Sequence, residues 1–258
     1  MAHCPVDYAP PKDLLKDRII LVTGAGDGIG RAVSKGLAEH GATVVLLGKT
    51  IKKLEAVYDE IMRAGGPLPG IYPMDLMGAS YNDYENMVGI LEKEYGRLDG
   101  LLHNAGILGE RAPIEHYETH IWQQVLQINL SAPFALTKAC LEILYKSSDA
   151  SVVYTGSSVG RKPRAYWGAY AVSKAGIEAL SAMLADETEF RGTVRVNSIN
   201  PGPVATKMRR LAFPAEDHNK LLTPEKIVPS YIYLLGPDSK GITGQQLDAQ
   251  RLGVSGAA

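Results

Sequence analysis

Strands and helices alternate along almost the whole chain, and this alternation limits the possible folds more than any other feature of the sequence. The apolar, β-branched runs at 19–22 and 43–47 are typical of strands that are covered on both faces of a sheet. Between these runs apolar residues recur at helical spacing, and Gly41 is placed to end the helix. A strand, a helix and a second strand in this order predict a right-handed crossover between parallel strands.

The pattern continues towards the C-terminus without a linker, an internal repeat or a shift in composition. Further helices are expected at 51–66, 81–96, 117–145 and 169–190, and further strands at 70–76, 98–106, 151–158, 194–202 and 244–250. We therefore expect one α/β domain with a parallel sheet over residues 17–250. Residues 1–16 would form an N-terminal extension and residues 251–258 a C-terminal tail.

The composition is that of an ordinary core-forming protein, with 45% hydrophobic and 21% charged residues in a chain of 258. A formal net charge of -1 lacks the positive field that nucleic acids and anionic membranes attract, so neither is an expected partner. Cys4 and Cys140 form no disulfide framework, and the six histidines have no metal-ligand spacing. No signal peptide or apolar run of about 18 residues stands out. We expect a cytoplasmic protein with reduced thiols and no metal.

A glycine-rich turn, TGAGDGIG at 23–30, joins the first strand to the first helix. It does not fit the regular dinucleotide motif GxGxxG, because its glycines follow the pattern TGxxxGxG, at Gly24, Gly28 and Gly30. The physical principle is shared: the backbone bends where a Cβ would clash, and the free N–H groups that start the helix face a diphosphate. A turn that only connects a strand to a helix is the alternative, but the position after the first buried strand favours a cofactor site.

The end of the second strand predicts which nicotinamide cofactor binds. A carboxylate there would bind the ribose hydroxyls of NAD, whereas a basic residue accepts the 2′-phosphate of NADP. Gly48 occupies the carboxylate position and Lys49 follows it, although Asp27 in the glycine turn would lie near the same phosphate and repel it. The sequence therefore favours NADP(H) over NAD(H).

A tyrosine and a lysine, Tyr170 and Lys174, lie one helical turn apart in AYAVSKAGIEAL. Lowering the pKa of a phenol from about 10 towards 7 requires roughly 4 kcal/mol. One cation about 4 Å away, at an effective dielectric constant of ~20, supplies a similar amount. The pair can therefore exchange a proton with a substrate if both side chains face a cleft at the carboxyl ends of the strands. The alternative is a solvated lysine that has this spacing by chance.

Six motifs in order make the chain resemble the classical short-chain dehydrogenase/reductase family over about residues 17–250: TGAGDGIG, HNAG, Asn129 in LQINLSAPF, GSSVG, YAVSK and NPGPVAT. The segments LLHNAG, SSVGR, WGAYAVSK and FPAED are most similar to the YciK-type bacterial oxidoreductases within it. The resemblance implies a single-domain Rossmann-type fold, a doubly wound parallel sheet of about seven strands with helices on both faces. It also implies hydride transfer between a nicotinamide cofactor and a carbonyl or secondary alcohol.

The resemblance further implies roles for individual residues. Tyr170 would be the acid/base, and Lys174 would lower its pKa and bind the nicotinamide ribose. Ser157 or the adjacent Ser158, with Ser157 favoured by its spacing, would hold the substrate oxygen, and Asn129 would extend a proton relay through water. Alternatively, Asn129 could be a core residue or only bend the helix ahead of Pro133, and a local break there would free a carbonyl that can hold the relay water. The cofactor site would comprise Gly24, Asp27, Gly28, Ile29, Gly30, Lys49, Asp75, Leu76, Asn104, Ala105, Gly106, Tyr170, Lys174, Pro201, Gly202, Val204 and Thr206.

The chain departs from the family pattern at three places. His103 replaces the asparagine that usually opens NNAG, which would change the polarity of the cleft wall, and Gly156 stands where a second serine is common. QQLDAQ at 245–250 lacks the usual glycine-rich ending, so different C-terminal packing is expected. The basic residues in the stretches 161–164 and 206–210 are interpreted as a solvated rim, and residues 208–222 as a substrate lid.

Two other functions are compatible with these residues. A sensor or assembly protein could bind NADP(H) with little turnover, although it would not need the set of catalytic side chains. An epimerase or dehydratase could use the same tyrosine and lysine, but it usually has a larger C-terminal substrate domain than the segment after Gly202 can build. In each case the resemblance implies a homodimer or homotetramer formed through the long helices around Asn129 and Tyr170.

Overall fold

The structure, a computed structural model, describes residues 8–250 and contains one sheet of seven strands in the order β3-β2-β1-β4-β5-β6-β7. The strands are β1 (Ile19–Thr23), β2 (Thr43–Gly48), β3 (Gly70–Pro73), β4 (Gly100–His103), β5 (Ala150–Thr155), β6 (Val194–Asn200) and β7 (Gln246–Asp248). Every neighbouring pair is parallel. The predicted doubly wound parallel sheet of about seven strands is confirmed.

Nine α-helices within residues 8–250 connect the strands or follow them. They are α1 (Gly28–Glu39), α2 (Ile51–Arg63), α3 (Tyr81–Tyr95), α4 (Thr119–Leu126), α5 (Ala132–Tyr145), α6 (Ser158–Arg161), α7 (Gly168–Glu189), α8 (Lys207–Ala212) and α9 (Val228–Leu235). Four short 3-10 turns are also present, η1 (Ile114–His116), η3 (His218–Lys220), η4 (Pro224–Ile227) and η5 (Pro237–Ser239). In this part of the chain no helix has the length and apolarity that a membrane crossing would require.

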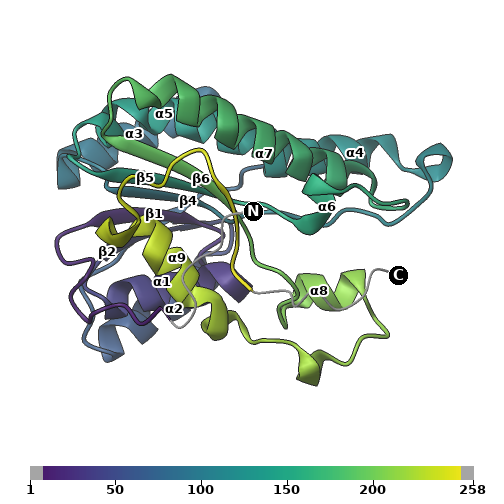
Figure 1. Cartoon of the computed structure of the whole chain (residues 1–258), viewed down its shortest axis with the longest axis horizontal. Helices are drawn as coiled ribbons and strands as arrows, with labels where there is room; N and C mark the ends of the chain where they lie inside the picture. The colour runs from purple at the N-terminus through teal and green to yellow at the C-terminus, as the bar shows by residue number, and fades with distance from the viewer. Residues whose placement is uncertain (1–7, 251–258) are drawn as a thin grey trace.

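The helices cover both faces of the sheet, as Figure 1 shows: α1, α2 and α9 lie on one face, and α3, α5 and α7 on the other. Leu37 and Tyr231 belong to the first of the two large hydrophobic cores, and Met87, Leu144 and Ile177 to the second. These side chains are almost completely buried. The continuous apolar runs of the strands follow from this arrangement, since both sides of each central strand face a core.

The described part of the predicted N-terminal extension, residues 8–16, packs onto the domain. Leu15 is fully buried, and its backbone N–H donates to His40 O at the end of α1 (2.9 Å). Tyr8 stacks edge-on against Tyr233 of α9 and donates a hydrogen bond to Asp238. This segment therefore contributes to the first core. Residues 1–7 and the predicted tail, 251–258, lie outside the described residues.

The predicted helical stretch over 117–145 is interrupted by one π-helical turn, η2 (Gln127–Ser131), between α4 and α5. Pro133 lies at the start of α5, and because the helix runs on through the π-turn its missing N–H leaves a carbonyl of the preceding turn without a helical donor. A π-turn widens the helix and changes the direction of the side chains on it. Asn129 lies in this turn, so the local break that we expected ahead of the proline is present.

The direction of the strand order reverses between β1 and β4, which are neighbours although β2 and β3 separate them in sequence. Crevices for ligands form outside the carboxyl ends of parallel strands at such a point. The glycine turn follows β1, the 104–106 segment follows β4, and α6 and α8 follow β5 and β6. Figure 1 shows α6 and α8 together at this end of the sheet.

Candidate active site

The glycine turn packs closely against the segment that follows β4. Gly24 has φ +68°, and a Cβ on it would lie 2.9 Å from Ala105 Cα. A Cβ on Gly30 would lie 2.2 Å from Gly24 O, so neither position can carry a side chain without a shift of the backbone. A Cβ on Gly28 would point across the crevice to Thr206, at 3.6 Å from Cγ2. The two predicted cofactor segments therefore face each other.

Thr23, at the end of β1, fixes the other wall of this crevice. Its buried hydroxyl oxygen accepts hydrogen bonds from the backbone N–H groups of Asn104 (3.0 Å) and Ala105 (3.1 Å). Its hydroxyl also donates to Leu102 O (3.2 Å), and the Asn104 amide donates to Thr23 O (3.4 Å). The 104–106 segment is thus held by the first strand, which places Gly106 towards Lys174 of α7.

Asp27 caps the N-terminus of α1 and is neutralised by a lysine that the sequence analysis did not single out. Its carboxylate accepts from Gly28 N (2.8 Å) and from Lys53 Nζ on α2 (2.5 Å). The hydrogen bond from Lys53 is the main reason that the pKa of Asp27 lies below its ordinary value. Lys49 is exposed at the end of β2, next to Gly48. The positive charge of Lys53 therefore compensates the repulsion that we expected between Asp27 and the 2′-phosphate.

The remaining predicted cofactor residues lie along the same edge of the sheet. Asp75 is exposed just beyond β3, and its carboxylate accepts the N–H of Met77 (3.0 Å). Leu76 is buried, and its carbonyl accepts from Gln127 at the start of the π-turn (3.3 Å). Ile29, in the first turn of α1, packs against the first core. These positions agree with a crevice that crosses the carboxyl ends of β1 to β4.

The predicted cofactor loop, 201–206, leaves β6 and leads into α8. Gly202 has φ +71°, in the left-handed region that glycine tolerates. Val204 is buried and forms an isolated bridge with Leu222, and the Thr206 hydroxyl caps α8 by accepting from Arg209 N (3.2 Å). The loop therefore connects the crevice to the predicted lid.

Tyr170 and Lys174 lie one turn apart near the start of α7. Lys174 Nζ is 5.8 Å from the centre of the Tyr170 ring, and it donates to Thr155 O at the end of β5 (2.6 Å). A Cβ on Gly106 would lie 3.9 Å from this Nζ, which brings the wall of the crevice beside it. Lys174 is 5% exposed and Tyr170 is partly buried, so the lysine faces the interior and not solvent. The alternative of a solvated lysine is excluded.

The pKa values of this pair depend on burial. Burial raises the pKa of Tyr170, and a hydrogen bond with Ser157 only partly opposes it. The lowering by Lys174 that we expected from the sequence is not seen in this arrangement, because the cost of burying a phenolate is larger. Burial lowers the pKa of Lys174 to about 8, against the charge of Glu178, which raises it. The lysine therefore keeps its charge through most of the neutral range.

Asn129 is buried and connects the π-turn to the segment after β4. Its Oδ1 accepts from Ile107 N (2.8 Å), and its Nδ2 donates to Ile107 O (2.9 Å) and to Ser173 Oγ (3.1 Å). A Cβ on Gly106 would lie 3.2 Å from Oδ1. Asn129 thus lies beside Lys174 and Gly106, as the proton-relay expectation requires.

Ser157 rather than Ser158 is the hydroxyl near Tyr170. Ser157 is the N-cap of α6 and interacts with the Tyr170 hydroxyl. A serine is common in the family at position 156, but here the position is glycine. A Cβ there would lie 2.4 Å from Glu178 Oε1, so the side chain of Glu178 accounts for the glycine. Glu178 is one turn beyond Lys174 on α7, and it is 5% exposed. The sequence analysis missed Glu178, although its spacing of four from Lys174 was visible.

His103 lies in the interior and does not form the cleft wall as expected. Its ring stacks on Tyr154 at 4.7 Å, and its Nε2 hydrogen-bonds the Thr137 hydroxyl (2.8 Å) on α5. Thr137 is in turn 2.8 Å from the Tyr154 hydroxyl. Burial, together with the charge of Lys174, lowers the pKa of His103 to about 3, so the imidazole is neutral. The residue joins β4, β5 and α5 in the second core.

The predicted lid, 208–222, contacts the start of α7 through aromatic side chains. The Phe213 ring lies 5.7 Å from that of Trp167, which lies 5.8 Å from that of Tyr170. Arg111 lies over Trp167 at 4.7 Å and donates to Ala212 O at the end of α8. An aromatic and arginine cluster thus lies between Tyr170 and the predicted lid. Trp167 both packs and borders the site.

The basic residues near the site are not a uniform solvated rim. Arg161 is largely buried and forms ion pairs with Glu178 (3.1 Å) and Asp248 (3.0 Å). Arg209 pairs with Glu216 through two hydrogen bonds of 2.6 Å. The expectation of a solvated rim is therefore wrong for these two arginines, which hold the surrounding elements together.

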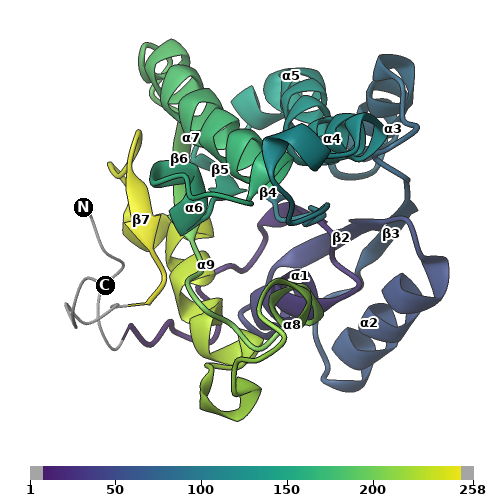
Figure 2. The same cartoon turned by 90° about the vertical axis from the view of Figure 1, so that its right-hand side faces the viewer.

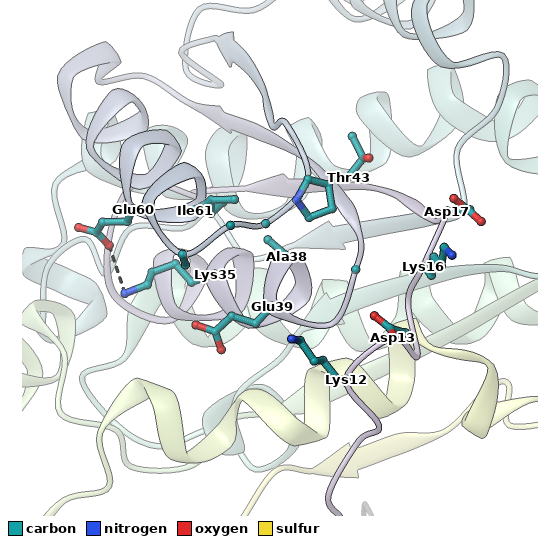
Figure 3. A pocket seen from close by; sticks show the side chains of 15 residues that line it. Lys12, Asp13, Lys16, Asp17, Lys35, Ala38, Glu39, Thr43, Glu60 and Ile61 are labelled. Atoms are coloured by element: carbon teal, nitrogen blue, oxygen red, sulfur yellow. Dashed lines mark ion pairs between the residues drawn. The ribbon is translucent and has the colours of Figure 1, made fainter.

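A separate hollow of about 630 Å³ lies at the opposite end of α1 and contains none of the predicted site residues (Figure 3). Its charged lining consists of Lys12, Asp13, Lys16, Asp17, Lys35, Glu39 and Glu60. Glu60 pairs with Lys35, and the other charges are mixed in sign, so no single ligand charge is favoured. Among residues 8–250 no group of histidine, cysteine and acidic side chains could hold a metal ion.

Comparisons with known proteins agree with this architecture. The short chain dehydrogenase family model matches residues 18–217. The oxidoreductase YciK of Escherichia coli strain K12 is 48% identical over 243 residues, which cover 94% of this chain and 96% of that protein. A solved short chain dehydrogenase from Pseudomonas syringae superposes with a TM-score of 0.93 at 51% identity, over 95% of this chain and 99% of that one.

A further solved relative contains a cofactor. A short chain dehydrogenase from Shigella flexneri 2a, complexed with NADP, superposes with a TM-score of 0.91 at 48% identity. The match covers 93% of this chain and 100% of that chain. The family match, the extent of these similarities and the seven-stranded parallel sheet lead to one conclusion. The chain belongs to the short chain dehydrogenase family and is an oxidoreductase of that family.

Proposed function

We propose that the chain is an NADP(H)-dependent reductase or dehydrogenase that interconverts a carbonyl compound and a secondary alcohol. The observation that supports this best is the position of Tyr170 and the buried Lys174 on one face of α7, beside Gly106 and Asn129. The bound nicotinamide would supply or accept the hydride. The protein residues would hold the substrate oxygen and move its proton.

In the direction of reduction, the Tyr170 hydroxyl would donate its proton to the substrate oxygen, which the Ser157 hydroxyl would also bind. The raised pKa of Tyr170 suits this step, because the phenol is protonated at neutral pH. The charge of Lys174 would stabilise the tyrosinate that remains. Asn129 would hold a water molecule beside Lys174, and this water would return a proton towards Tyr170.

The residues that face the crevice fit a dinucleotide. The N-terminus of α1 and the side-chain-free Gly28 would receive the diphosphate, and the 201–206 loop would cover the nicotinamide. Lys49 and Lys53 place two cations near the end of β2, and Lys53 already neutralises Asp27. This charge balance supports NADP(H) over NAD(H), in line with the NADP-bound relative from Shigella flexneri.

The test is a Tyr170→Phe variant compared with wild type. We expect both proteins to bind NADPH with the same Kd in a fluorescence titration, because the hydroxyl would act on the substrate and not on the cofactor. Carbonyl-dependent oxidation of NADPH, measured with a panel of ketones and aldehydes, should fall by at least about a hundredfold in the variant, as expected for a lost acid catalyst. Binding of NADPH with no Tyr170-dependent turnover on any carbonyl would instead identify a sensor.

A small-molecule carbonyl or alcohol is the proposed partner, and a homodimer or homotetramer the proposed assembly. Exposed apolar side chains on the outer helices support the assembly: Phe134 on α5 is 54% exposed and Met183 on α7 is 57% exposed. Light scattering can test the assembly by comparing the molar mass of wild type with that of the double variant Phe134→Asp, Met183→Asp. We expect wild type to have the mass of a dimer or tetramer and the variant a lower mass. A monomeric wild type would contradict the proposal. The cytoplasmic location stays a prediction.

A further inference from the structure

The cofactor loop has few backbone hydrogen bonds of its own. Pro201 and Pro203 have no N–H to donate, and Gly202 is the residue between them. Gly202 N donates to the side chain of Asn200 at the end of β6 (3.1 Å). The carbonyl groups of the two prolines face the end of β7, the outer strand in Figure 2, and not another part of the loop.

The side-chain amide of Gln250 bridges these two carbonyl groups. Its Nε2 donates to Pro201 O (2.7 Å) and to Pro203 O (2.9 Å). A side-chain amide nitrogen carries two hydrogens, so both bonds can form at the same time. The Gln250 side chain also lies directly on the loop, because a Cβ on Gly202 would be 2.9 Å from Gln250 Cδ. One side chain thus holds both ends of the Pro-Gly-Pro turn.

Asp248, two residues earlier, connects the same strand end to the catalytic serine. Its carboxylate accepts from Asn200 Nδ2 (2.8 Å), which orients the Asn200 oxygen towards Gly202 N. It also accepts from Arg161 Nη1 (3.0 Å), and Arg161 Nη2 donates to Leu247 O (2.8 Å). Arg161 is the last residue of α6, the helix that begins directly after Ser157. The end of β7 therefore contacts both loops that border the proposed reaction site.

We propose that Gln250 is a positioning residue that holds the 201–206 loop in the shape needed to cover the nicotinamide. This inference rests on the proposed function, since the loop matters only if a dinucleotide binds there. It gives a reason for the departure in QQLDAQ: a glycine at position 250 would have no amide to donate to the loop. In this chain the fixed position of the loop comes from a side chain of the last strand.

Gln250→Glu is the decisive variant because it keeps the length of the side chain but replaces the donor by a carboxylate that can only accept. Gln250→Ala removes the contact without adding a charge. Gln245→Glu is the matched control: the Gln245 amide donates to Thr243 O in its own turn and does not reach the loop. Melting temperatures of all three should remain close to wild type, because Gln250 bonds a surface loop.

Two measurements report on the conformation of the 201–206 loop and on NADPH binding. Hydrogen–deuterium exchange of the protein without added cofactor should become about tenfold faster for the peptide over 202–207 in both Gln250 variants, and should be unchanged in the control. Fluorescence titration should give a Kd for NADPH roughly tenfold higher in the same two variants. The loss of two hydrogen bonds of ordinary strength accounts for a change of this size.

The outcomes separate this inference from the proposed function. If wild type binds NADPH but the Gln250 variants exchange and bind like wild type, the role of Gln250 is refuted and the proposed function stands. Faster exchange of the loop with an unchanged Kd for NADPH also refutes the role of Gln250, since NADPH binding would then not depend on the contact between Gln250 and the loop. If wild type binds no NADPH at all, the proposed function itself fails.

Discussion

Lys174 should destabilise the fold, and the structure allows the size of this effect to be worked out. The side chain is 5% exposed, and burial lowers its pKa from 10.5 to about 8. A difference of that size between the folded and unfolded states corresponds to about 3 kcal/mol, at about 1.4 kcal/mol for each pKa unit. Replacement by methionine, of similar shape and without charge, should recover this energy at pH 7.

The variant also loses the hydrogen bond from Lys174 to Thr155 O, which contributes about 1 kcal/mol. We therefore expect Lys174→Met to be about 2 kcal/mol more stable than wild type at pH 7, which raises the melting temperature by roughly 4–8 °C in a chain of this size. Turnover should be lost at the same time. A gain in stability with a loss of activity is typical of a substitution at a buried functional charge.

The pKa of Lys174 determines in which direction the unfolding free energy of wild type changes with pH. Below about pH 8 the native and the unfolded states both keep the lysine proton, so wild type bears the full penalty of burial. Between about pH 8 and 10.5 the native state releases the proton while the unfolded state keeps it, so the unfolding free energy of wild type rises with pH. The advantage of the variant should therefore shrink across this window.

Urea unfolding of wild type and Lys174→Met at pH 7, 8.5 and 10 measures the difference, with the exposed Lys52→Met as a control for the general effects of pH. Groups that titrate in both proteins cancel in the comparison. A variant that is less stable than wild type at pH 7, by an amount that stays constant up to pH 10, would refute the reasoning. The buried lysine would then stabilise the fold.

Two further substitutions test contacts around the crevice. Lys53→Met should raise the Kd for NADPH roughly tenfold in a fluorescence titration and leave the Kd for NADH unchanged, because the Lys53 ammonium would contact the 2′-phosphate. Lys52→Met is the control. Equal changes of the Kd for both cofactors would contradict the assignment. Gly156→Ser, which restores the usual family residue, should destabilise the fold by about 1–3 kcal/mol in urea, because its Cβ would lie 2.4 Å from Glu178 Oε1. Gly89→Ser on the exposed face of α3, where a Cβ meets nothing within 4 Å, should cause no loss of stability, because serine has a higher helix propensity than glycine. Equal losses in the two variants would show that the contact with Glu178 is unimportant.

Much of the fold follows from local patterns. The apolar runs and the glycines between them predicted all seven strands near their observed positions and the parallel arrangement, because a strand buried on both faces needs continuous apolar residues. The sequence spacing of Tyr170 and Lys174 predicted a shared helix face, and the structure places both at the end of the sheet where the crevice lies. The Asn129 break was also visible, through Pro133.

The electrostatics of the site could not be obtained in this way. The sequence analysis expected Lys174 to lower the pKa of Tyr170, but burial acts in the opposite direction and is larger. Burial depends on side chains from segments far apart along the chain, and so do the contacts of His103, which lies against α5 and not in the cleft. A sequence motif indicates which residues are present but not how much water surrounds them.

By itself, then, the sequence determined the alternating architecture, the edge of the sheet where the site forms and the residues that belong to the family motifs. These features depend on short-range periodicity and spacing, which a single segment contains. The tertiary structure alone decided that Lys53 neutralises Asp27, that Glu178 occupies the space left by Gly156, and that Gln250 holds the 201–206 loop. Each of these contacts joins segments that only the folded sheet brings together, so distance in space, and not order along the chain, determines them.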